Sequence, residues 1–170
     1  VFAFLDDFQG RIDEYERLFM ENEIIITRMK GVAPLSAKRA INCSVTGPNL
    51  RASGVNWDLR RADPYEAYDQ MEFDVPLGTA GDNWDRLWIR IQEMKESARI
   101  VRQAVEQLPA GEVRTPAPFF IKPPPGEVYR SVEAPKGELG FYLVSDGTIA
   151  PWRCGIRSPS FINLTVLREL

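Results

Sequence analysis

The sequence of 170 residues contains no histidine and only two cysteines. Histidine is the commonest general base and metal ligand at neutral pH, so the chain cannot build a Ser-His-Asp or Cys-His catalytic site from its own residues. The two cysteines, Cys43 and Cys154, lie far apart and form no CxxC motif. This spacing argues against a disulfide framework and against a zinc site.

Three further features of the sequence narrow the range of possible functions. No apolar run approaches the length needed to cross a bilayer, so we expect membrane contact only through partners. The phosphate-binding patterns GxxxxGK[ST] and GxGxxG are both missing. The net charge is −3, and this overall charge does not predict nucleic-acid binding.

What is present is ordinary globular composition, with 44% hydrophobic and 26% charged residues, and a length suited to one domain over residues 1–170. The chain is organised around a long helix expected over residues 82–108. Asp82 is placed to cap its start, and Pro109 and Gly111 end it. Its apolar residues recur at spacings of three and four, which predicts one buried stripe: Trp84, Leu87, Trp88, Ile91, Met94, Ala98, Val101, Val105 and Leu108.

The remaining pattern predicts an α+β fold, mainly helical, with a small antiparallel β-hairpin region. A second amphipathic helix is expected near the N-terminus, and the run Ile24-Ile25-Ile26 suits either a buried strand or a continuing helix. Prolines mark residues 109–126 as a connection without regular structure. The helix near the N-terminus is expected at 2–22. Further elements are a short helix at 36–43, a strand at 72–77, strands at 127–132, 139–144 and 151–157 with a turn at 145–147, and a short helix after Pro159.

Two polar segments are candidates for a functional site. The loop 46–68 is rich in arginine and aromatic residues, which suits either bracing between loops or direct ligand contact. Within the segment EAPKGELG, Pro135 and Gly137 predict a turn that projects Lys136 between Glu133 and Glu138. A lysine held by two carboxylates suits a proton or charge relay, and the alternative is a salt-bridged turn entering a hairpin.

Several long segments in one order carry a family resemblance. They read LRASGVNWDLRRADPYEAYDQMEFDVPLG, GDNWDRLWIRIQEMKESARIV, PPPGEVYRSVEAPKGELGFYLVSDG and PWRCGIRSPSFINL. They closely resemble the 49-kDa-type core subunits (the D subunits) of respiratory complex I, the NADH:quinone oxidoreductase, a family that also includes the large subunit of nickel–iron hydrogenases. The resemblance covers nearly the whole chain, as a middle-to-late piece of a longer subunit.

The resemblance implies a part in an assembly. Such a subunit helps form the quinone site beside the terminal iron–sulfur cluster and couples quinone reduction to proton translocation. The expected partners are the small iron–sulfur subunit, the adjacent C subunit of the complex and the membrane-arm subunit at the quinone entrance. Quinone is shared with a partner subunit, and the chain itself is expected to bind no metal, flavin or NAD. The implied place is peripheral, on the cytoplasmic face of the bacterial inner membrane or the matrix side of the mitochondrial one.

The resemblance assigns possible site roles to only a few residues. Glu133, Lys136 and Glu138 become quinone-proximal or proton-relay candidates. Four further residues are expected to brace loops or to form an interface: Arg51, Asp58, Arg60 and Tyr65. No residue is expected to be catalytic by itself, and the chain alone is expected to be inactive.

The chain also departs from the family pattern. The segment RTPAPFFIK, residues 114–122, is much shorter than the corresponding family segment. The paired metal-binding cysteines of the hydrogenase branch are missing. The alternative function is a non-catalytic scaffold or interaction module of the same family.

Overall fold

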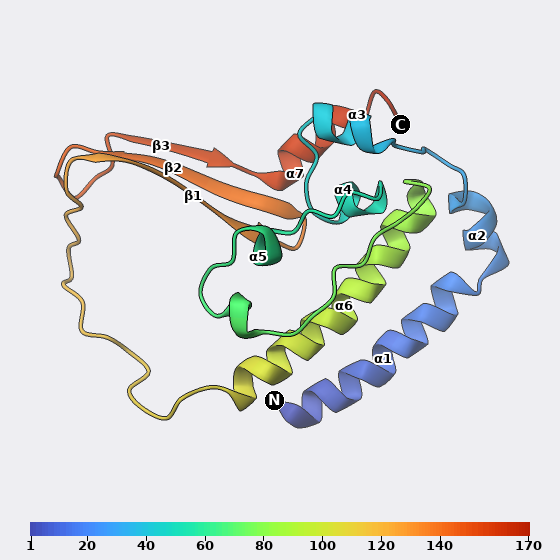
Figure 1. Cartoon of the computed structure of the whole chain (residues 1–170), viewed down its shortest axis with the longest axis horizontal. Helices are drawn as coiled ribbons and strands as arrows, with labels where there is room; N and C mark the ends of the chain where they lie inside the picture. Colours follow the sequence, from blue (N-terminus) through green and yellow to red (C-terminus); the bar gives the residue numbers. More distant parts are fainter.

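The computed structural model describes all 170 residues and has two long helices beside a layer of short helices, with a three-stranded sheet to one side (Figure 1). The helices and strands are α1 (Phe2–Met20), α2 (Glu23–Met29), α3 (Ala37–Asn42), α4 (Pro48–Ala52), α5 (Leu59–Ala62), η1 (Tyr68–Gln70), α6 (Asn83–Glu106), β1 (Gly126–Ala134), β2 (Gly137–Ser145), β3 (Arg153–Arg157), α7 (Pro159–Ile162) and η2 (Asn163–Val166). The predicted α+β class is confirmed.

The long helix α6 is the expected organising element, and α1 lies alongside it in the opposite direction (Figure 1). Asp82 caps α6 by accepting a hydrogen bond from the Asp85 amide at 2.9 Å, as the sequence predicted. Its other oxygen accepts from the Gly31 amide at 2.7 Å and so ties the end of α2 to the start of α6. The cap therefore sets both the helix start and the path of the preceding chain.

Burial along α6 differs from the predicted stripe. Ile89, outside the stripe, is fully buried together with Ile91, whereas Val101 and Leu108 are 43% and 74% exposed. The N-terminal half of α6 is covered both by α1 and by α4, while α4 does not reach the C-terminal half (Figure 1). The apolar pattern correctly predicted the helix but overstated how much of it is buried.

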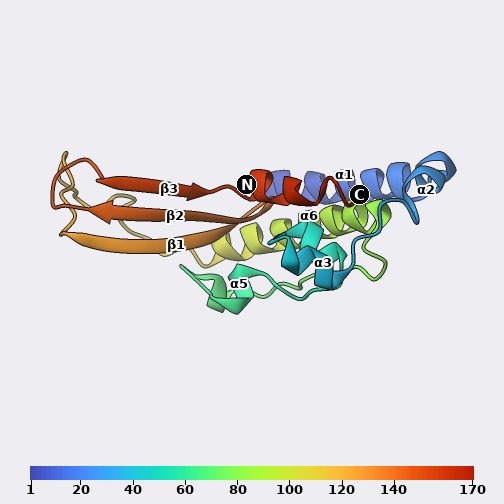
Figure 2. The ribbon, with the colours of Figure 1, turned by 90° about the horizontal axis from the view of Figure 1, so that it is seen from above.

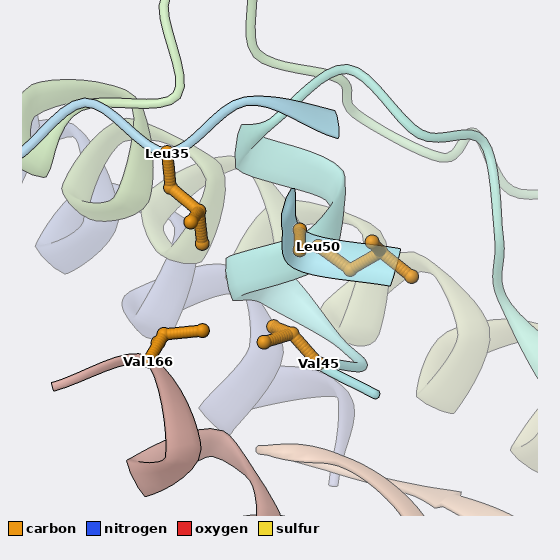
Figure 3. Close-up of a cluster of buried hydrophobic side chains, with 5 residues drawn as sticks. Leu35, Val45, Leu50 and Val166 are labelled. Carbon is orange, nitrogen blue, oxygen red and sulfur yellow. The ribbon is translucent and has the colours of Figure 1, made fainter. Parts of the chain in front are cut away.

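A compact hydrophobic cluster joins the short helices to the C-terminal segment. Ser36 caps α3, as expected, by accepting from the Arg39 amide at 3.3 Å. The buried side chains of Leu35, Val45, Leu50 and Val166 form one cluster (Figure 3), which Ala40 completes. Because Val166 of η2 packs against residues in and beside α3 and α4, the cluster ties η2 to these two helices.

The sheet has the order β1-β2-β3, with both pairs antiparallel. Only Pro135 and Lys136 lie between β1 and β2, and Glu133 stands opposite Glu138. The sheet extends away from the helices (Figure 2), and Val128, Phe141, Leu143 and Ile156 share one exposed face. The connection from α6 to β1 has no helix or strand.

Three local predictions need correction or resolution. Residues 72–77 form no strand, because side chains of α6 bind their backbone instead: the Glu72 amide donates to Gln103 at 2.8 Å and the Asp74 amide to Glu96 at 2.9 Å. The isoleucine run 24–26 belongs to helix α2. The connection between β2 and β3 spans residues 146–152, so β3 begins two residues later than expected.

No helix combines the length and apolarity that a membrane crossing requires.

Candidate functional site: a charged junction between α4, α6 and the β1–β2 turn

Two glycines allow the β1–β2 turn to lie directly against the start of α4. Gly47 and Gly137 have φ angles of 71° and 123°, in the region that favours glycine. A Cβ on Gly137 would lie 2.5 Å from Oγ1 of Thr46. The same Oγ1 accepts a hydrogen bond from the Glu138 amide at 3.1 Å, and Asn163 donates to the Lys136 carbonyl at 2.9 Å. The turn is thus fixed from both sides.

Arg51, on α4, is the centre of the junction and is only 1% exposed. Its Nε lies 2.7 Å from Oε1 of Glu93 on α6, and its Nη1 lies 2.9 Å from Oε1 of Glu133 on β1. Nη1 also donates to the Trp57 carbonyl at 3.0 Å and lies 3.4 Å from Asp58 Oδ2. One guanidinium therefore joins α4, α6, the hairpin and the loop before α5.

Asp58 and Arg60 form the second half of this charged network. The Asp58 side chain caps α5, and its Oδ2 lies 2.6 Å from Nη2 of Arg60. Burial raises the pKa of Asp58, but the hydrogen bond and charge of Arg60 and the charge of Arg51 outweigh burial, so this pKa lies below its ordinary value. Burial also raises the pKa of Glu93, and Arg51 only partly opposes that rise.

Tyr65 completes the contacts of the hairpin with the preceding loop. Its hydroxyl accepts a hydrogen bond from the Glu133 amide at 3.0 Å, while Glu133 Oε2 accepts from the Leu59 amide at 3.3 Å. Burial raises the pKa of Tyr65. The four residues expected to brace loops, Arg51, Asp58, Arg60 and Tyr65, thus all lie at this junction.

A cavity of about 410 Å³ opens beside the junction. Lys136 and Glu133 both contribute to its wall, whereas Glu138 does not. The cavity is lined by Arg51, Arg60, Arg90, Glu93, Met94, Ser97, Glu133, Ala134, Pro135 and Lys136. Two of the three relay candidates are therefore brought together at one site.

The expected pairing of Lys136 with both neighbouring carboxylates is wrong. Glu133 turns to Arg51, and Glu138 accepts from the Tyr129 hydroxyl at 2.9 Å and lies 3.6 Å from Arg157. Lys136 is exposed and has no carboxylate within 4.0 Å. Each of the two carboxylates pairs with an arginine that is distant in the sequence. The lysine ammonium therefore has no carboxylate partner and can donate hydrogen bonds into the cavity.

Sequence reasoning missed the contributions of α6 to this site. Glu93 and Arg90 lie outside the apolar stripe predicted for this helix, yet both line the cavity. Arg90 has no carboxylate within 4.0 Å and donates to Oδ1 of Asn49 at 2.8 Å. A cavity lined by two cations that have no carboxylate partner, Arg90 and Lys136, suits an acceptor oxygen, such as a carbonyl group, more than it suits a cation.

Comparisons with known proteins identify the family of this chain. The family described as respiratory-chain NADH dehydrogenase, 49 Kd subunit, matches residues 1–122 and 117–170. A protein named as the D subunit of NADH-quinone oxidoreductase from Dehalococcoides mccartyi (strain ATCC BAA-2266 / KCTC 15142 / 195) is 56% identical over 166 residues, which are 98% of this chain and 45% of that protein. A protein of the same name from Desulforamulus reducens is 51% identical over 167 residues, covering 98% of this chain and 46% of that protein.

The chain thus spans about 45% of the length of the curated relatives that it matches. The two family matches meet at residues 117–122, where the sequence is short relative to the expected family pattern. The alignment with the Dehalococcoides protein uses 166 positions for 98% of the chain, which leaves no room there for a long extra segment in that relative. The short connection is therefore shared with that relative.

Proposed function

Because this chain belongs to the 49 kDa subunit family of respiratory-chain NADH dehydrogenase, we propose that it acts within a core subunit of an NADH:quinone oxidoreductase. In this role it helps form the quinone site next to a partner's terminal iron–sulfur cluster and couples quinone reduction to proton translocation. The observation that carries the proposal is the family match along the whole chain, together with a donor-rich cavity at its charged junction.

Within this proposal, Lys136 and Glu133 are the quinone-proximal residues. The volume of about 410 Å³ falls within the range of roughly 300–1,000 Å³ typical of small-molecule sites. The Lys136 ammonium, free of carboxylate partners, donates a hydrogen bond to a quinone carbonyl and stabilises negative charge that develops on this oxygen during reduction. Glu138 is proposed as a further relay candidate through its hydrogen bond with Tyr129.

Arg51, Asp58, Arg60 and Tyr65 are proposed to hold the cavity wall in place. Their contacts fix Glu133 and the turn that carries Lys136 relative to α6. Such bracing matters because hydrogen-bond donors stabilise developing charge only when they are held in position beforehand.

The proposed partners are the small iron–sulfur subunit, the C subunit of the complex and a membrane-arm subunit, and the proposed location is peripheral on the inner membrane. Exposed apolar side chains on α1, such as Phe4 and Leu18, and on the sheet offer surfaces for packing against other chains. Electrons would reach the quinone from a cluster in a partner, so we propose that the chain alone is inactive. The alternative role is a non-catalytic scaffold of the same family.

The test replaces Lys136 in the assembled complex of the source organism. Lys136→Met is expected to lower quinone reductase activity by about tenfold or more, because a charge-assisted hydrogen bond is lost. Electron transfer from NADH to an artificial acceptor, and the yield of assembled complex, should remain unchanged. The matched control is Lys122→Met, which removes an exposed lysine outside the cavity. Normal quinone turnover in an assembled Lys136→Met complex would overturn the quinone role and favour the scaffold.

A further inference from the structure

A second cavity, of about 380 Å³, lies between the first half of α6, α4, the β1–β2 turn and the C-terminal segment. Arg90 and Lys136 line both this cavity and the one at the charged junction. Its wall otherwise differs, because the segment that follows β3 supplies most of the remaining residues. The cavity wall also includes Asn49 on α4 and Arg86 on α6, and the segment after β3 contributes Leu164 and Leu167.

The charged side chains that line this cavity are all cations: Arg86, Arg90 and Lys136. None of the three has a carboxylate within 4.0 Å. Arg86 is 8% exposed and donates to the carbonyls of Gly81, at 2.6 Å, and Ala33. These carbonyl oxygens and Oδ1 of Asn83 accept from its N–H groups but leave its positive charge without a carboxylate in direct contact.

Burial disfavours the positive charge of Arg86. Burial lowers the pKa of Arg86, and the charge of Asp82 only partly opposes that effect. Partial desolvation also lowers the pKa of Arg90, against a partial opposing effect of Glu93, although the Arg90 side chain as a whole is exposed. An anion in the cavity would relieve the cost of three neighbouring positive charges.

The same cavity also has apolar lining. Leu164 and Leu167 are 52% and 62% exposed, and the buried Leu35 and Val166 line it as well. The cavity therefore combines cationic side chains with accessible hydrocarbon surface. Such a combination matches a ligand that carries an acidic head and an apolar body.

We propose that this cavity binds an amphiphilic oxyanion, in which a carboxylate or phosphate head contacts Arg86, Arg90 and Lys136 and an alkyl or aryl body lies against Leu164 and Leu167. The proposal goes beyond the quinone role and does not depend on it. Its readout is ligand binding to the isolated full chain, so its failure is distinguishable from loss of quinone reductase activity.

The test is titration calorimetry with three probes: octanoate below its micelle-forming concentration, acetate and inorganic phosphate. Octanoate is expected to bind at one site about tenfold or more tightly than acetate, because its chain buries additional methylene groups. Arg90→Gln and Lys136→Met should each weaken octanoate binding by about tenfold or more. Leu167→Ser should remove most of the preference for octanoate over acetate.

Matched controls separate a built site from general attraction to positive charge. Arg153→Gln and Lys122→Met remove exposed cations outside both cavities and should bind octanoate as the parent chain does. Near-ultraviolet circular dichroism checks the fold of each variant, and Leu167→Ser changes a largely exposed side chain. Equal affinity for octanoate, acetate and phosphate, or undiminished binding by folded Arg90→Gln and Lys136→Met, would overturn the proposal.

Discussion

Replacing Arg51 by methionine is the most informative perturbation of the charged junction. Arg51 is 1% exposed and faces Asp58, Glu93 and Glu133, whose side chains are 1%, 16% and 5% exposed. Asp58 keeps Arg60 as a partner, so the substitution leaves chiefly Glu93 and Glu133 without an adjacent cation. Removing one member of a buried ion pair costs about 3–5 kcal/mol, which is a large part of the roughly 5–15 kcal/mol that stabilises a typical domain.

This loss should be visible in urea denaturation followed by far-ultraviolet circular dichroism. With an m value of about 2 kcal/mol/M, a loss of about 4 kcal/mol moves the unfolding midpoint down by about 2 M. The control is Arg11→Met, whose ion pairs with Asp7 and Glu14 lie on the surface at 60% exposure of the arginine. That control should cost less than about 1 kcal/mol.

The loss should also depend on pH, because burial already raises the pKa of Glu93 and loss of Arg51 raises it further. A carboxyl group with a raised pKa in the folded state favours folding below its unfolded value of about 4.3, and this contribution disappears as pH rises through the folded pKa. Arg51→Met should therefore lose more stability at pH 8 than at pH 5. Adding Glu93→Gln should recover part of the loss at pH 8.

A stability loss for Arg51→Met as small as that of Arg11→Met would refute the reasoning. The same holds if the loss is equal at pH 5 and pH 8, since the uncompensated carboxylates would then not be its cause.

Other substitutions test the remaining supports of the fold, each by its urea midpoint. Gly137→Ala should destabilise the folded state by about 1–3 kcal/mol, because the added Cβ would lie 2.5 Å from Oγ1 of Thr46 and the φ angle of this residue is positive. Gly10→Ala should instead stabilise the folded state by up to about 1 kcal/mol, because Gly10 lies inside a helix and the added Cβ meets no atom within 4 Å. Asp82→Ala should cost at least about 1 kcal/mol through loss of the α6 cap. Ile12→Ala should cost about 2–5 kcal/mol, since this fully buried side chain would leave a cavity in α1; a loss below about 1 kcal/mol would contradict its place in the core.

The elements that the sequence predicted correctly are those with local causes. The spacing of apolar residues and the Asp82 cap indicated α6, and the turn residues Pro135 and Gly137 between two predicted strands indicated the β1–β2 hairpin. The prediction from local sequence was wrong at residues 72–77, where a weak alternation of apolar and polar residues suggested a strand. The hydrogen-bond partners there are side chains about 22 to 31 positions later, on α6, and no local pattern reveals them.

The candidate site depended even more on distant contacts. The prediction that Lys136 lies between two carboxylates considered only neighbours in sequence. In the structure, Arg51 reaches Glu133 from 82 positions away and Glu93 from 42 positions away. A buried arginine and a surface arginine look alike in sequence, so the central role of Arg51 becomes visible only once α4, α6 and β1 are assembled.

The attachment of the hairpin at one end has a dynamic consequence. Its contacts with the helices lie near the turn, through Glu133, Gly137 and Glu138, while Gly126 and Ser145 lie at the end that extends away (Figure 1). Local opening needs less free energy where fewer tertiary contacts must break. Amide hydrogens should therefore exchange with deuterium fastest near Ser145 and progressively more slowly toward the turn, so that the hairpin opens from its free end while the cavity wall stays closed.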